Sequence, residues 1–310
     1  MDELQPGIFR HTFDLPLGID HVHCYFLRSS SGGFILVDTS LGTRDAEAKW
    51  RPVLDALDAP VEAIVITHMH PDHVGGARDV AALTGAPVFQ GREDHEQCRH
   101  AWGGRDPGVF AAYWTEHGMP PATVEGLIAE SDRLIAAVHW VEHPDRLLDP
   151  GDEVDGWHVE VLRGHADGHI VLHRDGVLIA GDTILSGITP AIGLYPNSRP
   201  DPLGDYLESL RRIEELAPRV AYAGHQAPVA DPPARAREIQ AHHADRLSRA
   251  EAVLDGAPLT AYDVSLAHFE ADLPVTLRRF ATAESLAHLE RLVREGRAER
   301  AERGYVKAGM

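Results

Sequence analysis

The chain has 310 residues, of which 44% are hydrophobic and 25% charged, and it contains two cysteines. This composition excludes a disordered, a collagen-like or a disulfide-stapled chain and is typical of one large globular domain or two smaller ones. Lysine and arginine number 29 against 48 acidic residues, which gives a formal net charge of −19. An anionic body of this kind repels phosphate backbones, so nucleic acid is not an expected partner.

We expect neither a secretory signal in the first ten residues nor a membrane span. The first ten residues carry two acids and no long apolar run, and nowhere do about eighteen apolar residues follow one another. Cys24 and Cys98 do not form a CxxC pair, so we interpret them as reduced structural cysteines. We therefore expect a cytoplasmic protein without a membrane partner.

The first elements in chain order predict a layered α/β fold. Residues 25–38 alternate apolar runs around a Ser/Gly turn, which predicts a β-hairpin. Residues 61–67, VEAIVIT, read as a strand buried on both faces, followed by a helix from about Val74 that closes at Gly85 and a strand over 86–90. This succession is the βαβ rhythm of an α/β domain.

In the middle of the chain a helical segment interrupts the alternation of strands and helices, and strands are predicted again after it. Residues 92–143 are helical in pattern and rich in large apolar groups, which indicates either an inserted helical cap or an extension of the core. Strands are predicted again over 157–162, 170–173 and 177–180. A Gly/Pro-rich loop over 185–202 then precedes a helix over 203–216.

The C-terminal part has a different composition. After a linker at 231–233 we predict helices over 235–254, 261–269 and 275–294, with Thr260 as an N-cap, and a short hairpin over 297–307. From Arg235 onward there are 12 cations and 12 anions, which leaves 17 cations and 36 anions before it. We therefore predict two domains, 1–230 and 231–310.

One loop gathers several potential metal ligands. The run Thr67-His-Met-His-Pro-Asp-His73 follows the buried strand, and His68 and His70 alternate so that both rings can point to one side. Asp72 and His73 lie past a proline that turns the chain. Imidazole nitrogens with a carboxylate suit zinc, and also iron or manganese, better than calcium.

Further ligands are expected from later strand ends. His165, Asp182 and His225 each follow a glycine that comes after an apolar strand. The glycine lets the backbone approach closely and present the next side chain at the carboxyl end of the strand.

Taken together, these motifs resemble the metallo-β-lactamase superfamily over about residues 7–230. The resemblance implies an αββα sandwich, with His68, His70 and His165 on one zinc ion, Asp72, His73 and His225 on a second, and Asp182 as the bridging carboxylate. Asp38, at the end of the strand FILVD, resembles a family aspartate that supports the metal loop.

Other residues near these motifs have less defined roles. His169 resembles the second histidine of the family's GHxxGH motif and is expected either to support the ligands or to pack. Asp167 stands where the family often has Pro or Ser. His21 and His23 we interpret as structural.

The predicted function is a dinuclear-zinc hydrolase in which metal-bound hydroxide attacks a small-molecule thioester or ester, or a lactone. Asp72 and Asp182 would hold and partly neutralise the two ions. The alternatives are a single-strand endoribonuclease of the same superfamily, which the charge disfavours, and an iron-dependent persulfide dioxygenase.

The C-terminal segment resembles the winged-helix-like domain of a subgroup of hydrolases that are compared with hydroxyacylglutathione hydrolase. The run Asp201 to Tyr206, DPLGDY, fits the same subgroup. Its balanced charge favours a protein contact, such as a homodimer, over DNA binding. Trp102, Trp114 and residues 188–195 either accommodate the acyl group or pack the helical cap.

Overall fold

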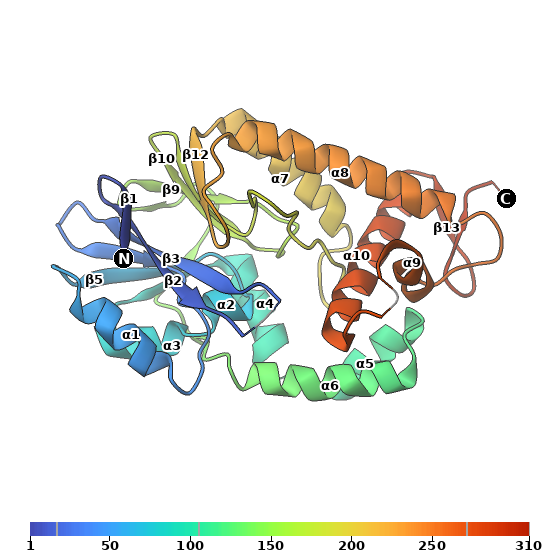
Figure 1. Ribbon diagram of the computed structural model, residues 1–310, viewed down its shortest axis with the longest axis horizontal. Helices are drawn as coiled ribbons and strands as arrows, with labels where there is room; N and C mark the ends of the chain where they lie inside the picture. The colour runs from blue at the N-terminus through green and yellow to red at the C-terminus, as the bar shows by residue number, and fades with distance from the viewer. Residues whose placement is uncertain (17, 105, 271, 310) are drawn as a thin grey trace.

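The computed structural model describes residues 1–16, 18–104, 106–270 and 272–309. Two β-sheets pack face to face at one end of the molecule, and a group of helices forms the other end (Figure 1). Among the described residues the first sheet has seven strands, in the order β1 (Asp2–Gln5), β2 (Ile8–Asp14), β3 (His21–Arg28), β4 (Phe34–Val37), β5 (Val61–Ile66), β6 (Val88–Gly91) and β7 (Arg146–Leu148).

The second sheet lies against the first. In the described part of the chain its order is β12 (Val220–Ala223), β11 (Val177–Gly181), β10 (Ile170–Arg174), β9 (Trp157–Val161) and β8 (Glu153–Val154). Leu27, Ile35 and Val65 of the first sheet pack against Leu172 and Ile179 of the second. This apolar layer explains why both sheets are rich in β-branched and large aliphatic residues.

Helices cover both outer faces, so the predicted αββα sandwich is confirmed. The first sheet is covered by α1 (Ala46–Asp55) and α3 (Ala77–Thr84), through Trp50 and Val80. The second is covered by α7 (Pro202–Leu216) and α8 (Pro232–Ala252), through Leu210 and Ile239. The hairpin at 25–38, the buried strand at 61–67 and the helix ending at Gly85 are confirmed.

Within residues 92–104 and 106–143 the structure has three helices, α4 (Arg92–Trp102), α5 (Pro107–Glu116) and α6 (Pro121–Ile135). Their large apolar groups divide between two places. Trp102 packs against the core of the first sheet, whereas Phe110, Trp114, Met119 and Leu127 form a separate cluster with Ala283 of α10 (Val275–Arg294). The segment is therefore partly an extension of the core and partly a cap that contacts the C-terminal helices.

The C-terminal elements follow the predicted order, with α8, α9 (Ala261–His268) and α10 and then the hairpin of β13 (Ala298–Arg300) and β14 (Tyr305–Lys307). Thr260 caps α9 as predicted, since its hydroxyl accepts from the Asp263 amide and the Asp263 carboxylate accepts from the Thr260 amide. The apolar cluster of the second sheet continues across residue 231 into these helices. The domain boundary at 231 stays a prediction.

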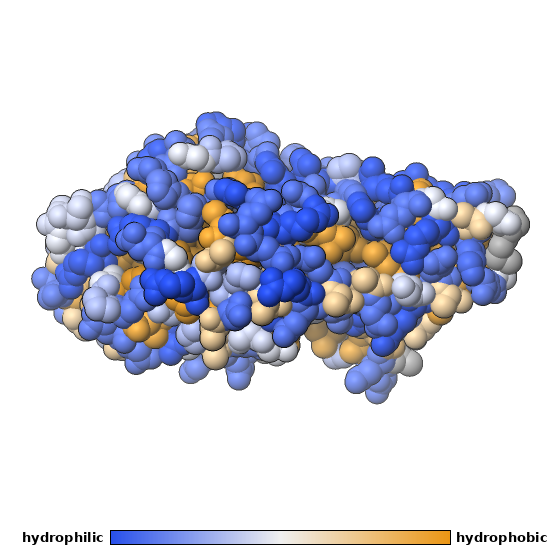
Figure 2. All heavy atoms as spheres, turned by 90° about the horizontal axis from the view of Figure 1, so that it is seen from above, coloured by the Kyte–Doolittle hydropathy of each residue, from blue (hydrophilic) through white to orange (hydrophobic). Residues whose placement is uncertain are grey.

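The face of the molecule that Figure 2 shows is mainly polar. The face in Figure 2 shows small apolar patches between larger hydrophilic areas. No helix among the described residues is both long enough and apolar enough to cross a bilayer.

Candidate metal centre

The loop that follows β5 carries four of the site's side chains. Thr67 ends the buried strand, and His68 and His70 follow it before Pro71 starts the short helix α2 (Pro71–Val74). Proline at a helix's first position needs no hydrogen-bond donor and presets the helical φ. The chain therefore turns directly after His70 and brings Asp72 and His73 back toward the end of the strand.

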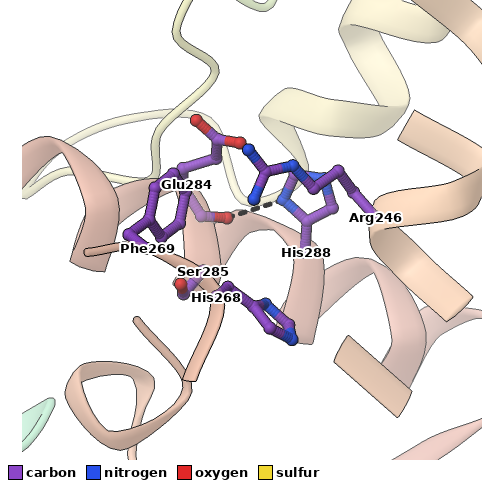
Figure 3. A pocket seen from close by; sticks show the side chains of 6 residues that line it. All are labelled: Arg246, His268, Phe269, Glu284, Ser285 and His288. Atoms are coloured by element: carbon purple, nitrogen blue, oxygen red, sulfur yellow. Dashed lines mark hydrogen bonds between the residues drawn. The ribbon is translucent and has the colours of Figure 1, made fainter. Parts of the chain in front are cut away.

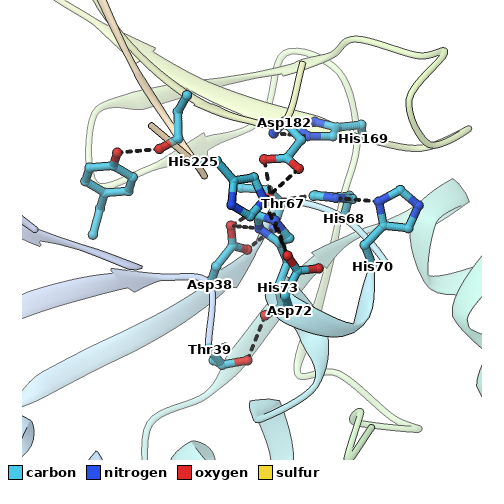
Figure 4. A network of polar contacts seen from close by, with 12 residues as sticks. Asp38, Thr39, Thr67, His68, His70, Asp72, His73, His169, Asp182 and His225 are labelled. Carbon is cyan, nitrogen blue, oxygen red and sulfur yellow. Dashed lines mark hydrogen bonds and ion pairs between the residues drawn. The ribbon is translucent and has the colours of Figure 1, made fainter. Parts of the chain in front are cut away.

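Three later strand ends bring the remaining ligands to the same place, and Figure 4 shows two of them, Asp182 and His225, beside the metal loop. Asp182 directly follows β11, His225 comes two residues after β12, and His165 lies in the loop after β9. Their polar atoms form groups, each with ligand atoms within 4.8 Å of one another, that include the two triads implied by the family resemblance: His68, His70 and His165; Asp72, His73 and His225; and His68, His73 and Asp182.

Asp182 lies between the two triads. Its Oδ2 is 3.1 Å from His225 Nε2 and 3.7 Å from His165 Nε2, while its Oδ1 is 3.5 Å from His73 Nε2. The Asp72 carboxylate is 3.3 Å from His225 Nε2. On the other side, His68 Nε2 and His70 Nδ1 are 3.0 Å apart. One carboxylate thus faces a histidine of each triad, which is the arrangement a bridging ligand requires.

Several atoms of this cluster are buried without any hydrogen-bond partner. They are Nε2 of His73, His165 and His225 and Oδ1 of Asp182. An unpartnered buried polar atom costs about 1–3 kcal/mol, and native structures rarely keep several of them together. Because the four atoms converge, and because imidazole nitrogen with carboxylate oxygen is the donor set of zinc and related ions, the residues fit a pair of divalent cations.

The electrostatics differ between the two triads. Burial lowers the pKa of His68, His70 and His165, whereas His73 and His225 of the second triad favour positive charge. Burial by itself lowers the pKa of His225, but Asp182 and Asp72 raise it to about 10. The pKa of His73 is likewise raised well above its usual value, against burial, by Asp182, Asp38 and Asp72. Conversely, burial raises the pKa of the Asp182 carboxyl, but His73 and His225 outweigh this effect and hold it well below its ordinary value. The carboxylates therefore create a site for cations.

Hydrogen bonds fix which nitrogen of each histidine faces the cluster. His73 donates from Nδ1 to Asp38 Oδ2 over 2.8 Å, and His225 donates from Nδ1 to the His21 carbonyl over 2.6 Å. His165 donates from Nδ1 to the Ala191 carbonyl over 3.0 Å. With the proton held on Nδ1, Nε2 of each ring carries the lone pair that a metal ion needs.

Asp38 also orders the start of the metal loop, because its two oxygens accept from the Thr67 amide and hydroxyl at 2.8 Å each. Its φ of 63° is in the left-handed region, which aspartate tolerates better than most residues. His169 is fully buried, stacks on His68 and accepts from the Asp182 amide over 3.0 Å. Asp38 thus contacts the ligand His73, and His169 contacts the backbone of Asp182, so His169 takes the supporting rather than the packing role that the sequence left open.

Gly224 shows why a glycine precedes a ligand. A Cβ added there would lie 2.4 Å from Asp182 Oδ1 and 2.6 Å from His73 Cε1. Any side chain at this position would push apart Asp182 and His73. The Gly-His pair at 224–225 is therefore a requirement of close packing at the site.

Two residues of α4 form hydrogen bonds with the metal loop, a role that the sequence did not predict for them. Asp94 in the first turn of α4 accepts from the Met69 amide over 2.8 Å, and Trp102 at the end of the same helix donates to the Met69 carbonyl over 2.8 Å. Burial raises the pKa of the Asp94 carboxyl well above its ordinary value. The only signal for Asp94 was an acidic residue just after a strand end, which is common in helix first turns.

Other candidate residues fall outside the two triads. His21 and His23 hold the loop of His225, since His21 Nε2 accepts from the Gln226 amide and His23 Nε2 donates to its carbonyl. Asp167 accepts from the Arg199 amide over 2.8 Å. Trp114, one of the residues considered for an acyl pocket, is completely buried in the cap cluster, so it packs the cap.

A two-sheet sandwich with histidines and aspartates gathered at its strand ends defines a metal-dependent hydrolase. The chain belongs to the metallo-beta-lactamase superfamily, whose profile matches residues 17–225, and the profile of the metallo-beta-lactamase-like C-terminal domain matches residues 247–307.

Relatives and solved structures match most of the chain. The chain is 26% identical over 302 residues to the probable metallo-hydrolase YqjP of Bacillus subtilis, covering 90% of each chain. It is 29% identical over 183 residues to a hydroxyacylglutathione hydrolase of Aeromonas salmonicida, covering 56% of this chain and 53% of that one. A metallo-beta-lactamase family protein of Thermus thermophilus superposes with a TM-score of 0.84 at 37% identity, over 98% of this chain and 100% of that one.

Proposed function

We propose that this protein is a dinuclear-zinc hydrolase that cleaves a thioester or ester bond of a small molecule. The observation that carries the proposal is the convergence of four unpartnered buried atoms, Nε2 of His73, His165 and His225 and Oδ1 of Asp182. Three imidazoles and a carboxylate suit zinc, with iron and manganese as the competing ions.

The two triads divide the ligands between the ions. His68, His70 and His165 would hold one ion, Asp72, His73 and His225 the other, and Asp182 would bridge them. When bound, such an ion pair supplies an activated water at neutral pH and polarises the carbonyl under attack.

The chain's own residues orient this centre. Asp38, the His21 carbonyl and the Ala191 carbonyl hold protons on the far nitrogens of three histidines, so their Nε2 atoms stay available as ligands. Asp72 is more exposed than the other second-triad ligands, with 14% of its side chain accessible against 0–1% for His73 and His225. The substrate would therefore approach the cluster past Asp72.

A thioester is favoured by two considerations. Relatives that match half to two thirds of the chain are named hydroxyacylglutathione hydrolase. A thiolate also leaves without prior protonation because its ordinary pKa is about 8.5, so a site without a dedicated general acid suits it. The excess of acidic residues before Arg235 favours a small molecule over single-stranded RNA.

The proposal also includes the cell compartment of the protein and the role of its C-terminal domain. Both cysteines are free and buried, which supports the reducing cytoplasm. The helices α8 to α10 with the hairpin β13–β14 support a winged-helix-like C-terminal domain, which we assign to contact with a second copy of the chain.

Elemental analysis of purified, tag-free protein, with a panel of thioesters and esters tested on the same sample, would check the function. We expect about two zinc ions per chain and turnover that a chelator abolishes. Asp72→Ala should lose about half of the metal. Full turnover in chelator-treated protein would overturn the proposal, and one iron per chain with no hydrolysis would replace it with persulfide oxidation.

A further inference from the structure

The segment from Leu185 to Tyr195, here called the strap, joins β11 to α7 and contains neither helix nor strand. It touches the loops of both ligand triads. The Gly187 amide donates to the side chain of Gln226, the neighbour of His225, over 2.8 Å. At the other end, the Ala191 carbonyl accepts from His165 Nδ1. The strap therefore contacts a ligand of one triad and the neighbour of a ligand of the other.

Residues outside the two-sheet sandwich hold the strap in place. Arg235 of α8 donates from Nε to the Leu185 carbonyl over 2.8 Å and from Nη2 to the Ile188 carbonyl over 2.9 Å. The hydroxyl of Tyr113 in α5 donates to the Leu194 carbonyl over 2.9 Å. The Leu194 amide donates to the Ala283 carbonyl of α10 over 3.1 Å.

The strap also packs closely on α10. A Cβ added at Gly193 would lie 2.9 Å from the Ala283 Cβ and 2.7 Å from the Tyr195 ring. The Tyr195 ring in turn stands edge-on to Trp114 of the cap at 6.1 Å between centroids. The strap is thus fixed by backbone hydrogen bonds and by contacts with both the cap and the C-terminal helices.

We propose that the cap and the C-terminal helices position the metal ligands through the strap, with Tyr113 and Arg235 as the positioning residues. The His165 ring can donate from Nδ1 only while the Ala191 carbonyl stays in place, and this donation keeps Nε2 free for a metal ion. Tyr113 donates its hydrogen bond to Leu194, three residues after Ala191. Arg235 donates to the carbonyls of Leu185 and Ile188, which lie on either side of Gly187. This inference rests on the proposed metal centre but on no particular substrate.

The experiment compares Tyr113→Phe and Arg235→Met with two matched controls. Tyr262→Phe changes another tyrosine packed against the cap cluster, and Arg237→Met removes another α8 arginine that pairs with a glutamate. Within the described part of the chain, neither control side chain donates a hydrogen bond to the strap. In cobalt-loaded protein, we expect Tyr113→Phe and Arg235→Met to lose metal to a chelator about tenfold faster and to shift the visible cobalt bands, as expected when support of a ligating histidine is weakened.

A second measurement does not depend on metal. The His165 Nδ1 proton should exchange with solvent faster in Tyr113→Phe than in Tyr262→Phe, as followed by the imidazole N–H resonance. Melting temperatures establish that all four variants are folded. Unchanged cobalt bands, metal loss and proton exchange in Tyr113→Phe and Arg235→Met would overturn the inference. Protein that binds no metal would contradict the proposed function, and the proton exchange would still decide the role of the strap.

Discussion

The buried histidine clusters of the metal centre and of the C-terminal helices differ in one respect. Burial lowers the pKa of His68, His70 and His165 at the metal centre, as it does for the C-terminal histidines, but two metal-centre histidines depart from this pattern. At the metal centre, neighbouring carboxylates raise the pKa of His73 and His225. In the C-terminal helices, His243 and His288 are 1% and 3% exposed, and burial lowers their pKa values to about 3 and about 4.

The surroundings of the C-terminal pair differ from those of His73 and His225. His288 donates from Nδ1 to the Glu284 carbonyl, so its Nε2 accepts from His243 Nδ1 over 3.2 Å (Figure 3 shows the surroundings of His288). The nearby charged side chain of Arg246 further disfavours protonation of both rings. Burial alone therefore produces neutral histidines, and the facing carboxylates are what raise the pKa values of His73 and His225 and favour a cation beside them.

Asp182→Asn is expected to have the largest effect, because it makes the first cluster more like the second. Without this carboxylate the pKa values of His73 and His225 should fall, and the bridging ligand is lost. We expect metal affinity and hydrolysis to fall by at least about 100-fold, beyond the loss typical of an outer hydrogen-bond partner. Metal titration followed by activity assay measures both.

The matched control is Asp175→Asn, the same change at an exposed turn between β10 and β11. Its φ of 52° is one that asparagine also tolerates. Equal metal affinity in the two variants would show that the carboxylates do not define the cation site.

Asp94→Ala tests the support behind the metal loop. The change leaves the Met69 amide without its acceptor, and the loop of His68 and His70 should loosen. We expect metal affinity to fall about 10- to 100-fold. Asp94→Asn keeps one oxygen for the Met69 amide and should recover part of the loss. If Asp94→Ala bound metal as tightly as the original protein, the loop would be held by other contacts.

Much of the metal centre could be predicted from the sequence, because its ligands follow strand ends and short motifs. His68 to His73 lie within six residues, and His165, Asp182 and His225 each follow a glycine. The supports were not predictable in the same way. Asp94 meets Met69 across 25 residues, and Tyr113 meets Leu194 across 81, so no local pattern marks either pair.

The fold also divides into elements that local sequence predicts and contacts that it does not predict. Periodicity located the strands β4 to β6 and β9 to β11 of the sandwich and the C-terminal helices, since burial of one face is a local property, but it did not predict β1, β2, β7 and β8. It left residues 92–143 open between a cap and an extension of the core, because the aromatic spacing is the same in both cases. Only the contacts decide that Trp102 joins the core and Trp114 joins the cap.

The pH dependence of the unfolding free energy tests whether His243 and His288 are neutral in the folded protein. The folded pKa values of His243 and His288 lie below the unfolded value of 6.5, so the fold favours their neutral forms. This contribution is complete above pH 6.5 and is lost as pH falls toward 4. The loss is up to about 1.4 kcal/mol per pH unit for each histidine.

Denaturant unfolding between pH 7 and 4.5 would measure this loss. The double variant His243→Leu with His288→Leu should show a shallower fall in unfolding free energy than the original protein, while the contribution of the metal-centre histidines is common to both. Parallel curves would mean that the pair does not stay neutral in the fold.

Thr260→Ala should have the smallest effect, since it touches neither histidine cluster. The change removes the N-cap of α9. We expect the free energy of unfolding to fall by about 1 kcal/mol and the melting temperature to fall by about 2 °C. Metal content and turnover should not change. Thr115→Ala, at an exposed position of α5, serves as the neutral reference for calorimetry. A change in metal affinity in Thr260→Ala would show that α9 also bears on the metal centre.

The apolar cluster that crosses residue 231 determines how cooperatively the molecule unfolds. It joins Val171 and Leu178 of the second sheet to Ile239, Leu286 and Tyr305 of the C-terminal part. Unfolding the C-terminal helices would leave the outer face of that sheet in water, so the two halves cannot melt independently. Heat should therefore produce a single cooperative transition, with a calorimetric enthalpy equal to the van't Hoff enthalpy.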